Sequence, residues 1–455
     1  YRPSFLFYLV CTPCTPMFMM VFTSVYGVVD GLFVSNYVGK TAFATINLIM
    51  PMDMIFGGVG FMLGTGGSAL VAKTLGEQDT DRANRYFSMI IWVTVIVGAV
   101  LSVIGIAVIR PVSILLGADE GMLPDCVLYG SIMMGFTITF MFQNAFQAFL
   151  ITAERPNLGL AATIAAGISN MVLDALFFAV FDWGVAGAAV ATGLSQCVGG
   201  VIPLIYFLRP NTSLLRLKRT KLEIRPIINA CANGASEMVS SVTSSVVGIL
   251  YNLQLLQYAG ENGVASYGVL MYVQFVFAAI FLGYSMGSAP IISYHYGAEK
   301  HGELKNLFQK SVVLMGTIGG GMVVAAQLFA VPLSRLFVGY DATLFEMTVH
   351  AIRIAGVSFL IMGFNIFASA FFTALNNGGV SAVISFLRTF VFKLAAVLLL
   401  PLLLGLEGIW WAEVTAEISA FVLSLIFLFI NRKKYHYVIM YNFFSYPQKP
   451  ATRYR

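Results

Sequence analysis

The sequence predicts an all-α integral membrane protein with twelve transmembrane helices in two pseudo-symmetric six-helix bundles. The first observation is composition: 58% of the residues are hydrophobic and only 10% are charged, whereas soluble proteins are about a quarter charged. The second is the presence of apolar runs of about 20 residues or more, which favour helices over the shorter alternating strands of a barrel. The third is an internal repeat.

Apolar segments separated by polar loops define the predicted helices. Pro13 and Pro16 should kink the first of them, because proline removes a backbone donor. A basic segment, 209–225, is the longest polar interruption and divides an N-terminal lobe, 1–208, from a C-terminal lobe, 226–431, which a tail, 432–455, follows. The predicted helices are 8–38, 43–73, 86–116, 121–151, 157–181, 185–208, 226–258, 263–296, 304–338, 343–374, 378–404 and 407–431.

Basic residues gather in alternating loops, among them Lys73, Arg155, Lys218 and Lys300. The positive-inside rule then places both termini in the cytoplasm, and we expect a multi-pass protein of the plasma (inner) membrane. Because the net charge of +5 is distributed in this way, we expect the lipid bilayer as a partner and no nucleic acid.

Four motifs of the first half recur in the second half. Gly67-Ser68-Ala69 recurs as Gly287-Ser288-Ala289, Gly76 as Gly297, Phe87 as Phe308, and Gly184-x-x-Gly187 as Gly405-x-x-Gly408. The offset is about 221 residues each time. Two six-helix copies face the same way across a membrane, with a cavity between them near its midplane. This arrangement favours a secondary transporter, and we expect it to act as a monomer.

Several other functions lack their motifs. The segment from Gly66 to Lys73 lacks the glycine that precedes the lysine of a phosphate-binding loop. Cys11 and Cys14 read as small apolar residues of a membrane helix, and His295 and His301 do not make a metal site. The sequence therefore predicts neither an enzyme nor a cofactor, and an H⁺ or Na⁺ gradient is the expected energy source.

Two acids, Asp30 and Asp174, lie inside predicted membrane helices of the first half. Such residues are costly in lipid and usually functional. Each follows a polar residue on the same helix face. We predict that the pair binds H⁺ or Na⁺, the only metal ion considered; the alternative is that these residues merely hydrogen-bond helices together. Tyr26 and Asn170 are the residues one turn before the acids, and polar residues of other helices, among them Asn144 and Thr192, are expected to converge on the same interior.

The second half lacks this pair, because the repeat offset aligns Asp30 with Tyr251 and Asp174 with Ala395. It carries other intramembrane charges, namely Glu237, Arg388, Lys393, Glu413 and Glu417. Glu237 either neutralises a cationic substrate or pairs with Arg388, and structural ion pairing is equally open for the others. The residues predicted to line a substrate cavity are Gln143, Gln147, Gln196, Glu237 and Arg388.

Together these motifs resemble the multidrug and toxic compound extrusion (MATE) family, from about residue 8 to 431. The resemblance rests on Val28–Val34, Glu154-Arg155-Pro156-Asn157, Asn170–Asp174 and Gly184–Ala189. It implies export of organic cations and hydrophobic drugs in exchange for H⁺ or Na⁺. In the DinF-like branch a cluster of the N-terminal lobe is associated with ion coupling, and Glu237 matches an acid of the seventh helix in other branches. The resemblance to that branch implies the ion-coupling residues Tyr26, Asp30, Asn144, Asn170, Asp174 and Thr192.

Two alternatives remain. A lipid-linked oligosaccharide flippase shares this general architecture, but it would favour cationic side chains in the cavity, and the clear interior charges of the first lobe are acidic. A non-transporting membrane receptor or scaffold would leave the buried acids and the repeat unexplained.

Overall fold

The computed structural model describes residues 14–27, 29, 40–116, 118, 120–339, 341–435 and 437. Pro13 and Asp30 lie outside them. Residues 14–27 are helical and belong to the predicted first span. The helices that follow in the first half are α2 (Lys40–Gly76), α3 (Thr80–Leu115), α4 (Leu123–Gly135), α5 (Thr137–Thr152), α6 (Pro156–Ala179) and α7 (Gly184–Leu208).

The second half consists of further long helices. They are α8 (Ile224–Gly297), α9 (His301–Val338), α10 (Ala342–Gly356), α11 (Phe359–Ala374), α12 (Gly378–Phe386), the π-helix η1 (Leu387–Phe392), α13 (Lys393–Leu404) and α14 (Leu406–Asn431). Gly260, at φ 62°, divides α8 into two membrane-length helices. Among the described residues, nine helices are long and apolar enough to span a membrane, or up to eleven spans if each of two bent pairs is one. The helical membrane fold is thus confirmed.

Two predicted helices, 121–151 and 343–374, are bent rather than continuous. The bend between α4 and α5 measures 53°, and that between α10 and α11 measures 50°. At the first bend Ser102 and Thr137 both donate to the Met134 carbonyl, and at the second Ser358 donates to the Ala355 carbonyl. Side chains that bond to backbone carbonyls are a known cause of kinks. Gly135 and Gly356 end the first segments, so the bend recurs at the repeat offset.

A second repeated feature opens the last helix of each lobe. Gly184 is the first residue of α7 and has φ 53°, and Gly405 directly precedes α14 and has φ 59°. L-residues with a side chain rarely adopt these angles, whereas glycine does so readily. The two glycines that repeat in the sequence therefore also share a backbone conformation.

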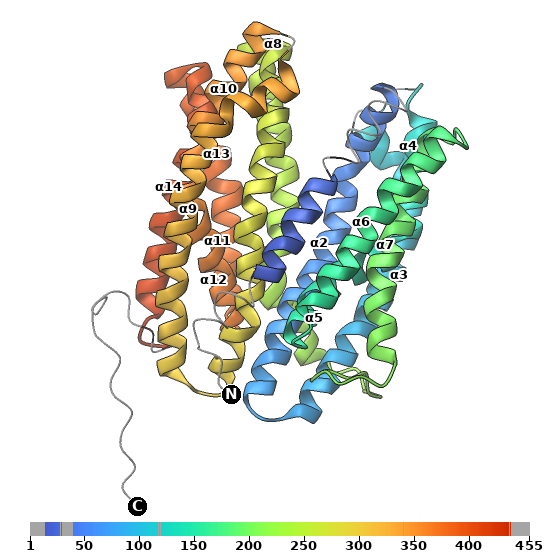
Figure 1. Ribbon diagram of the computed structural model, residues 1–455, viewed down its shortest axis with the longest axis vertical. Helices are drawn as coiled ribbons and strands as arrows, with labels where there is room; N and C mark the ends of the chain where they lie inside the picture. Colours follow the sequence, from blue (N-terminus) through green and yellow to red (C-terminus); the bar gives the residue numbers. More distant parts are fainter. Residues whose placement is uncertain are drawn as a thin grey trace, which may run out of the picture.

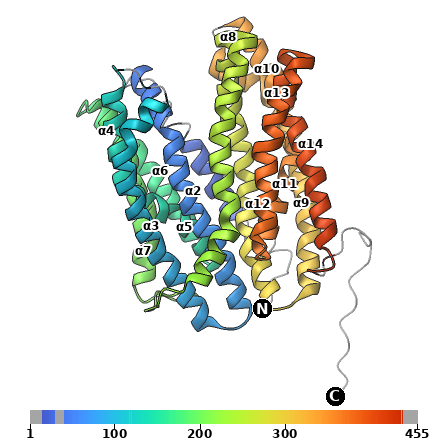
Figure 2. The same cartoon turned by 180° about the vertical axis from the view of Figure 1, so that it is seen from behind.

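The two lobes lie side by side and meet along α2 and α8 (Figures 1 and 2). In both views they approach each other at the end where α2 meets α3 and diverge toward the end near α4 and α10. At the close end, a Cβ added to Gly76 would lie 2.1 Å from the Tyr294 carbonyl oxygen, and one added to Gly297 would lie 2.1 Å from the Lys73 carbonyl oxygen. The repeat offset relates Gly76 to Gly297 and Lys73 to Tyr294, so each lobe makes the same contact with the other.

The segment between the lobes packs against the N-terminal lobe. The backbone N–H of Arg216 donates to Asn84 Oδ1 at 2.7 Å, and that of Lys218 donates to Ser88 Oγ at 2.7 Å. Both acceptors lie on α3. The segment therefore fixes the end of α7 to the start of α8 along a defined path.

Candidate functional site

Helix α6 presents its two predicted site residues inside the protein. Asp174 is fully buried and Asn170, one turn earlier, is 2% exposed. The helix starts at Pro156, where the missing N–H costs nothing because the first turn has no intrahelical acceptor. Its sequence contains no lysine or arginine. An ionised Asp174 therefore has no cation on its own helix.

The helix formed by residues 14–27 contacts both lobes. Against the N-terminal lobe, Gly167 of α6 faces Phe22 and Tyr26, whose nearest ring atoms lie 2.7 and 3.1 Å from an added Cβ. Against the C-terminal lobe, Gly283 of α8 faces Met17, whose Cα lies 2.4 Å from an added Cβ. The ribbon places this helix between the bundles (Figure 1). Tyr26 is thereby held against α6, one turn before Asn170.

The other predicted coupling residues lie on α5 and α7. Asn144 is 5% exposed and donates from Nδ2 to the Gly57 carbonyl of α2 at 3.2 Å. Thr192 is half-buried on α7, and its carbonyl accepts from Ser195 Oγ at 2.7 Å. The structure thus brings Tyr26 to α6 and Asn144 to α2. Convergence of the whole set on Asp30 stays a prediction, because Asp30 lies outside the described residues.

Three glutamines predicted to line a cavity are buried in the N-terminal lobe. Gln143, Gln147 and Gln196 are 6%, 5% and 7% exposed. Gln143 packs on α7 at Gly199, where an added Cβ would lie 2.9 Å from its Cδ. No described residue donates a hydrogen bond to the Oε1 atom of any of the three. These oxygens supply acceptor capacity to the interior between α5 and α7.

One membrane-embedded acid, Asp53 of α2, was missed by our reading of the sequence. It lies in a membrane-length helix, four residues before Gly57 and so on the same face as the Asn144 contact. It makes no hydrogen bond or ion pair with another described residue. The signal was available, since Asp53 is the only acid between Lys40 and Gly76.

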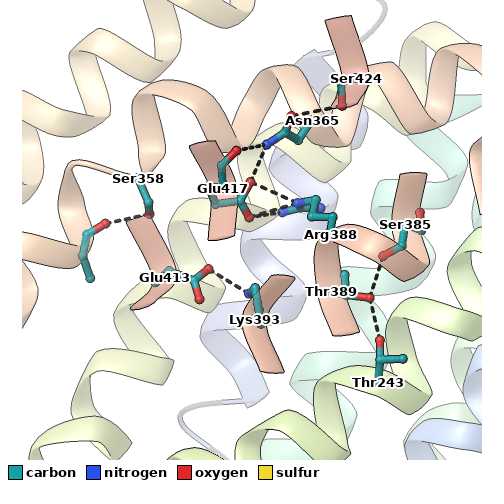
Figure 3. A network of polar contacts seen from close by, with 11 residues as sticks. Thr243, Ser358, Asn365, Ser385, Arg388, Thr389, Lys393, Glu413, Glu417 and Ser424 are labelled. Atoms are coloured by element: carbon teal, nitrogen blue, oxygen red, sulfur yellow. Dashed lines mark hydrogen bonds and ion pairs between the residues drawn. The ribbon is translucent and has the colours of Figure 1, made fainter. Parts of the chain in front are cut away.

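A buried polar network occupies the C-terminal lobe (Figure 3). Arg388 donates from Nε to both carboxylate oxygens of Glu417 at 2.9 and 3.1 Å, and its Nη2 lies 2.9 Å from Oε1. Asn365 Nδ2 donates to Glu417 Oε2 at 2.6 Å, and Ser424 donates to Asn365 Oδ1 at 3.2 Å. Glu417 is fully buried. A buried carboxylate held in this way is a fixed structural anion.

A second ion pair lies beside the first. Lys393 Nζ lies 2.8 Å from Glu413 Oε1. Glu237 interacts electrostatically with Arg388, but it makes no ion pair with that residue, whose guanidinium binds Glu417. The structure thus shows ion pairing for Arg388, Lys393, Glu413 and Glu417, and the alternative in which Glu237 pairs with Arg388 is wrong. The role of Glu237 toward a cationic substrate stays a prediction.

The π-helix η1 sets the position of these cations. A π-turn inserts an extra residue into a helix and is frequent at functional sites. Thr389, within η1, donates to the Ser385 carbonyl at 2.7 Å and shares a hydrogen bond of 2.6 Å with Thr243 of α8. This contact fixes η1 against α8, with Arg388 directed toward Glu417 (Figure 3).

Comparison with known proteins identifies the family. The family model MatE matches residues 16–176 and again residues 238–398, one segment in each lobe. The chain belongs to the MatE family. The double match also confirms the duplication that the glycine motifs predict.

Relatives of similar length are named multidrug export proteins. The chain is 24% identical to the multidrug export protein MepA of Staphylococcus saprophyticus over 90% of both chains. It is 23% identical to MepA of Staphylococcus aureus over 92% of both. Among solved structures, MATE in complex with MaL6 has a TM-score of 0.90 at 20% identity, covering 94% of this chain and 96% of that one. An outward-facing MATE family transporter has a TM-score of 0.89 at 21% identity with the same coverage.

Within this MatE chain the two lobes differ at equivalent positions. At the offset that relates Gly184 to Gly405, Asn144 corresponds to Asn365. The same offset relates Gln196 to Glu417 and Thr192 to Glu413. The C-terminal lobe thus bears acids where the N-terminal lobe bears neutral groups, and it supplies two cations to pair with them.

Proposed function

We propose that this protein is a multidrug efflux antiporter that exports organic cations and hydrophobic drugs in exchange for H⁺ or Na⁺. Family membership and the similarity to MepA proteins, which are named as multidrug exporters, support this proposal. The observation that carries it is the fully buried Asp174 on α6, packed in the lobe against which the helix of residues 14–27 lies. We also propose that the protein works as a monomer in the plasma (inner) membrane, with cytoplasmic termini.

The mechanism follows from where that first helix lies. Binding of H⁺ or Na⁺ at Asp30 and Asp174 neutralises charge beside α6 and so removes a desolvation cost. The helix of residues 14–27, which precedes Asp30 in the chain, also contacts Gly283 of the other lobe. A change in its position or bend alters the packing between the lobes. Substrate and ion then compete by favouring different arrangements of the lobes.

The test is gradient-driven ethidium efflux from proteoliposomes, with H⁺ and Na⁺ gradients imposed separately. Asp174→Asn and Asp30→Asn should each lower the rate at least tenfold with the driving gradient. Asp182→Asn is the matched control: it removes the same charge from an exposed position at φ 51°, a conformation that Asn tolerates. Efflux at the wild-type rate in both the Asp174→Asn and the Asp30→Asn variant refutes the coupling site.

The flippase alternative is disfavoured by the ion pairs. A pyrophosphate lipid needs cations with unsatisfied charge, whereas Arg388 and Lys393 are each bound to a carboxylate. Translocation of a fluorescent pyrophosphate lipid without ethidium efflux would favour it instead.

A further inference from the structure

The acidic cluster of the C-terminal lobe carries more negative than positive charge. Arg388 interacts electrostatically with three carboxylates, those of Glu417, Glu413 and Glu237. Among the described residues in this cluster, only Arg388 and Lys393 are cations. With all of these groups ionised, one negative charge is left over, and an unneutralised charge in the membrane interior attracts a cation.

The two ion pairs are built differently. Glu417 receives the planar guanidinium of Arg388 in a forked contact and a further hydrogen bond from Asn365. Glu413 receives one contact from Lys393, a mobile point charge on a long stem. The Lys393 side chain is 20% exposed and that of Glu413 is 9% exposed, whereas Glu417 is fully buried. Lys393 is therefore the cation that another cation can replace.

Aromatic rings lie beside the replaceable pair. Tyr251 and Tyr267 of α8 stack with ring centroids 4.8 Å apart and planes 6° apart. Both interact electrostatically with Glu413, and both belong to the hydrophobic cluster that contains Trp410 and Val414 of α14. Tyr251 is 4% exposed, and its hydroxyl has no hydrogen-bond partner among the described residues. Carboxylates flanked by aromatic faces suit organic ammonium groups.

We propose that Glu413, Tyr251 and Tyr267 form a binding site for a monovalent organic ammonium, which takes the place of the Lys393 ammonium while the Arg388–Glu417 pair stays intact. Lys393 thus acts as a built-in competitor that occupies the site when it is empty of substrate. The inference rests on the proposed function, because it names where in the C-terminal lobe a cationic substrate binds.

The test is equilibrium binding of ethidium to the purified full-length protein in detergent, without any gradient. Lys393→Met removes the competitor and should lower the Kd about tenfold, equivalent to about 1.4 kcal/mol. Lys393→Gln, which keeps a donor for Glu413, should shift the Kd in the same direction if the Met variant does not fold. Lys221→Met, at an exposed position in the segment between the lobes, is the matched control and should leave the Kd unchanged.

The remaining variants separate this site from a purely structural ion pair. Glu413→Gln should raise the Kd at least tenfold, and Lys393→Met should no longer tighten binding in that background. Tyr251→Phe should retain binding, whereas Tyr251→Leu should weaken it several-fold because the ring is lost. If Lys393→Met and Lys393→Gln both fail to lower the Kd, the pair is structural and the site is wrong. If this pattern holds while wild type shows no gradient-driven efflux, the site stands and the proposed antiport fails.

Discussion

The reciprocal glycine contacts between α2 and α8 predict how the protein is held in its present arrangement of lobes. A Cβ at Gly297 would lie 2.1 Å from the Lys73 carbonyl oxygen and 2.8 Å from its carbonyl carbon. Ordinary contacts are 3.4–4 Å, so the helices must separate by more than an ångström. Both atoms are backbone, and no side-chain rotation relieves the clash. Gly297→Ala should therefore loosen the closed end of the lobe interface.

The cost follows from overpacking a tight interface, typically about 1–3 kcal/mol. Since about 1.4 kcal/mol is a factor of ten in an equilibrium constant, the substitution should shift the population toward lobes separated at this end by about tenfold or more. Ser293, which donates to the Ala69 carbonyl at 2.6 Å across the same interface, would lose its partner as the helices part.

Spin labels at the exposed positions Thr80 and Glu303, in a background with the native cysteines replaced, report this separation by electron–electron distance measurement. Gly297→Ala should add a longer distance component. Gly268→Ala, in α8, is the control, since an added Cβ there meets nothing within 4 Å. Identical distance distributions in the two variants would show that the interface is not held by close glycine packing.

Three further predictions concern other elements. Arg388→Met leaves Glu417 buried without its cation and should cost about 3 kcal/mol, seen as a lower Tm in detergent, with partial recovery in the double variant with Glu417→Gln. Asn84→Ala removes the acceptor of the Arg216 N–H and should speed tryptic cleavage at Arg216 without abolishing folding. Asp53→Asn should raise the Tm, because a neutral amide costs less to bury, and should leave efflux within about twofold of wild type if coupling rests on Asp30 and Asp174; a loss of efflux would add Asp53 to the coupling groups.

Apolar runs and repeated glycines were enough to predict the helices and the duplication. Gly184 in one lobe and Gly405 in the other both have positive φ angles. Because such angles favour glycine, the repeated glycines could be recognised from the sequence alone. The bends after Gly135 and Gly356 were not predicted, because they depend on side chains such as Ser102 reaching a carbonyl on another helix. Hydrophobicity predicts that a segment crosses the membrane, but it does not predict whether the helix is straight or bent.

The pairing of the intramembrane charges could not be predicted from the sequence, for a related reason. Arg388 and Glu417 lie on different elements, and which face Arg388 occupies depends on the π-helix η1. An extra residue in that turn rotates everything before it relative to α13, so the 3.6-residue period no longer assigns faces. The number of charges could be read from the sequence. That Arg388 pairs with Glu417 and not with Glu237 could be seen only from the path of the backbone in the structure.

The contrast between the lobes explains why one duplicated fold can carry two kinds of chemistry. Helices α5, α6 and α7 contain no lysine or arginine, so an acid such as Asp174 has no tethered cation on these helices. In the other lobe, η1 and α13 bring Arg388 and Lys393 to Glu417 and Glu413. Acids paired with cations of their own lobe change charge only when another cation displaces one of them, whereas an acid on helices without lysine or arginine changes charge when a free ion binds. The first behaviour suits recognition of a cationic substrate and the second suits coupling to an ion gradient.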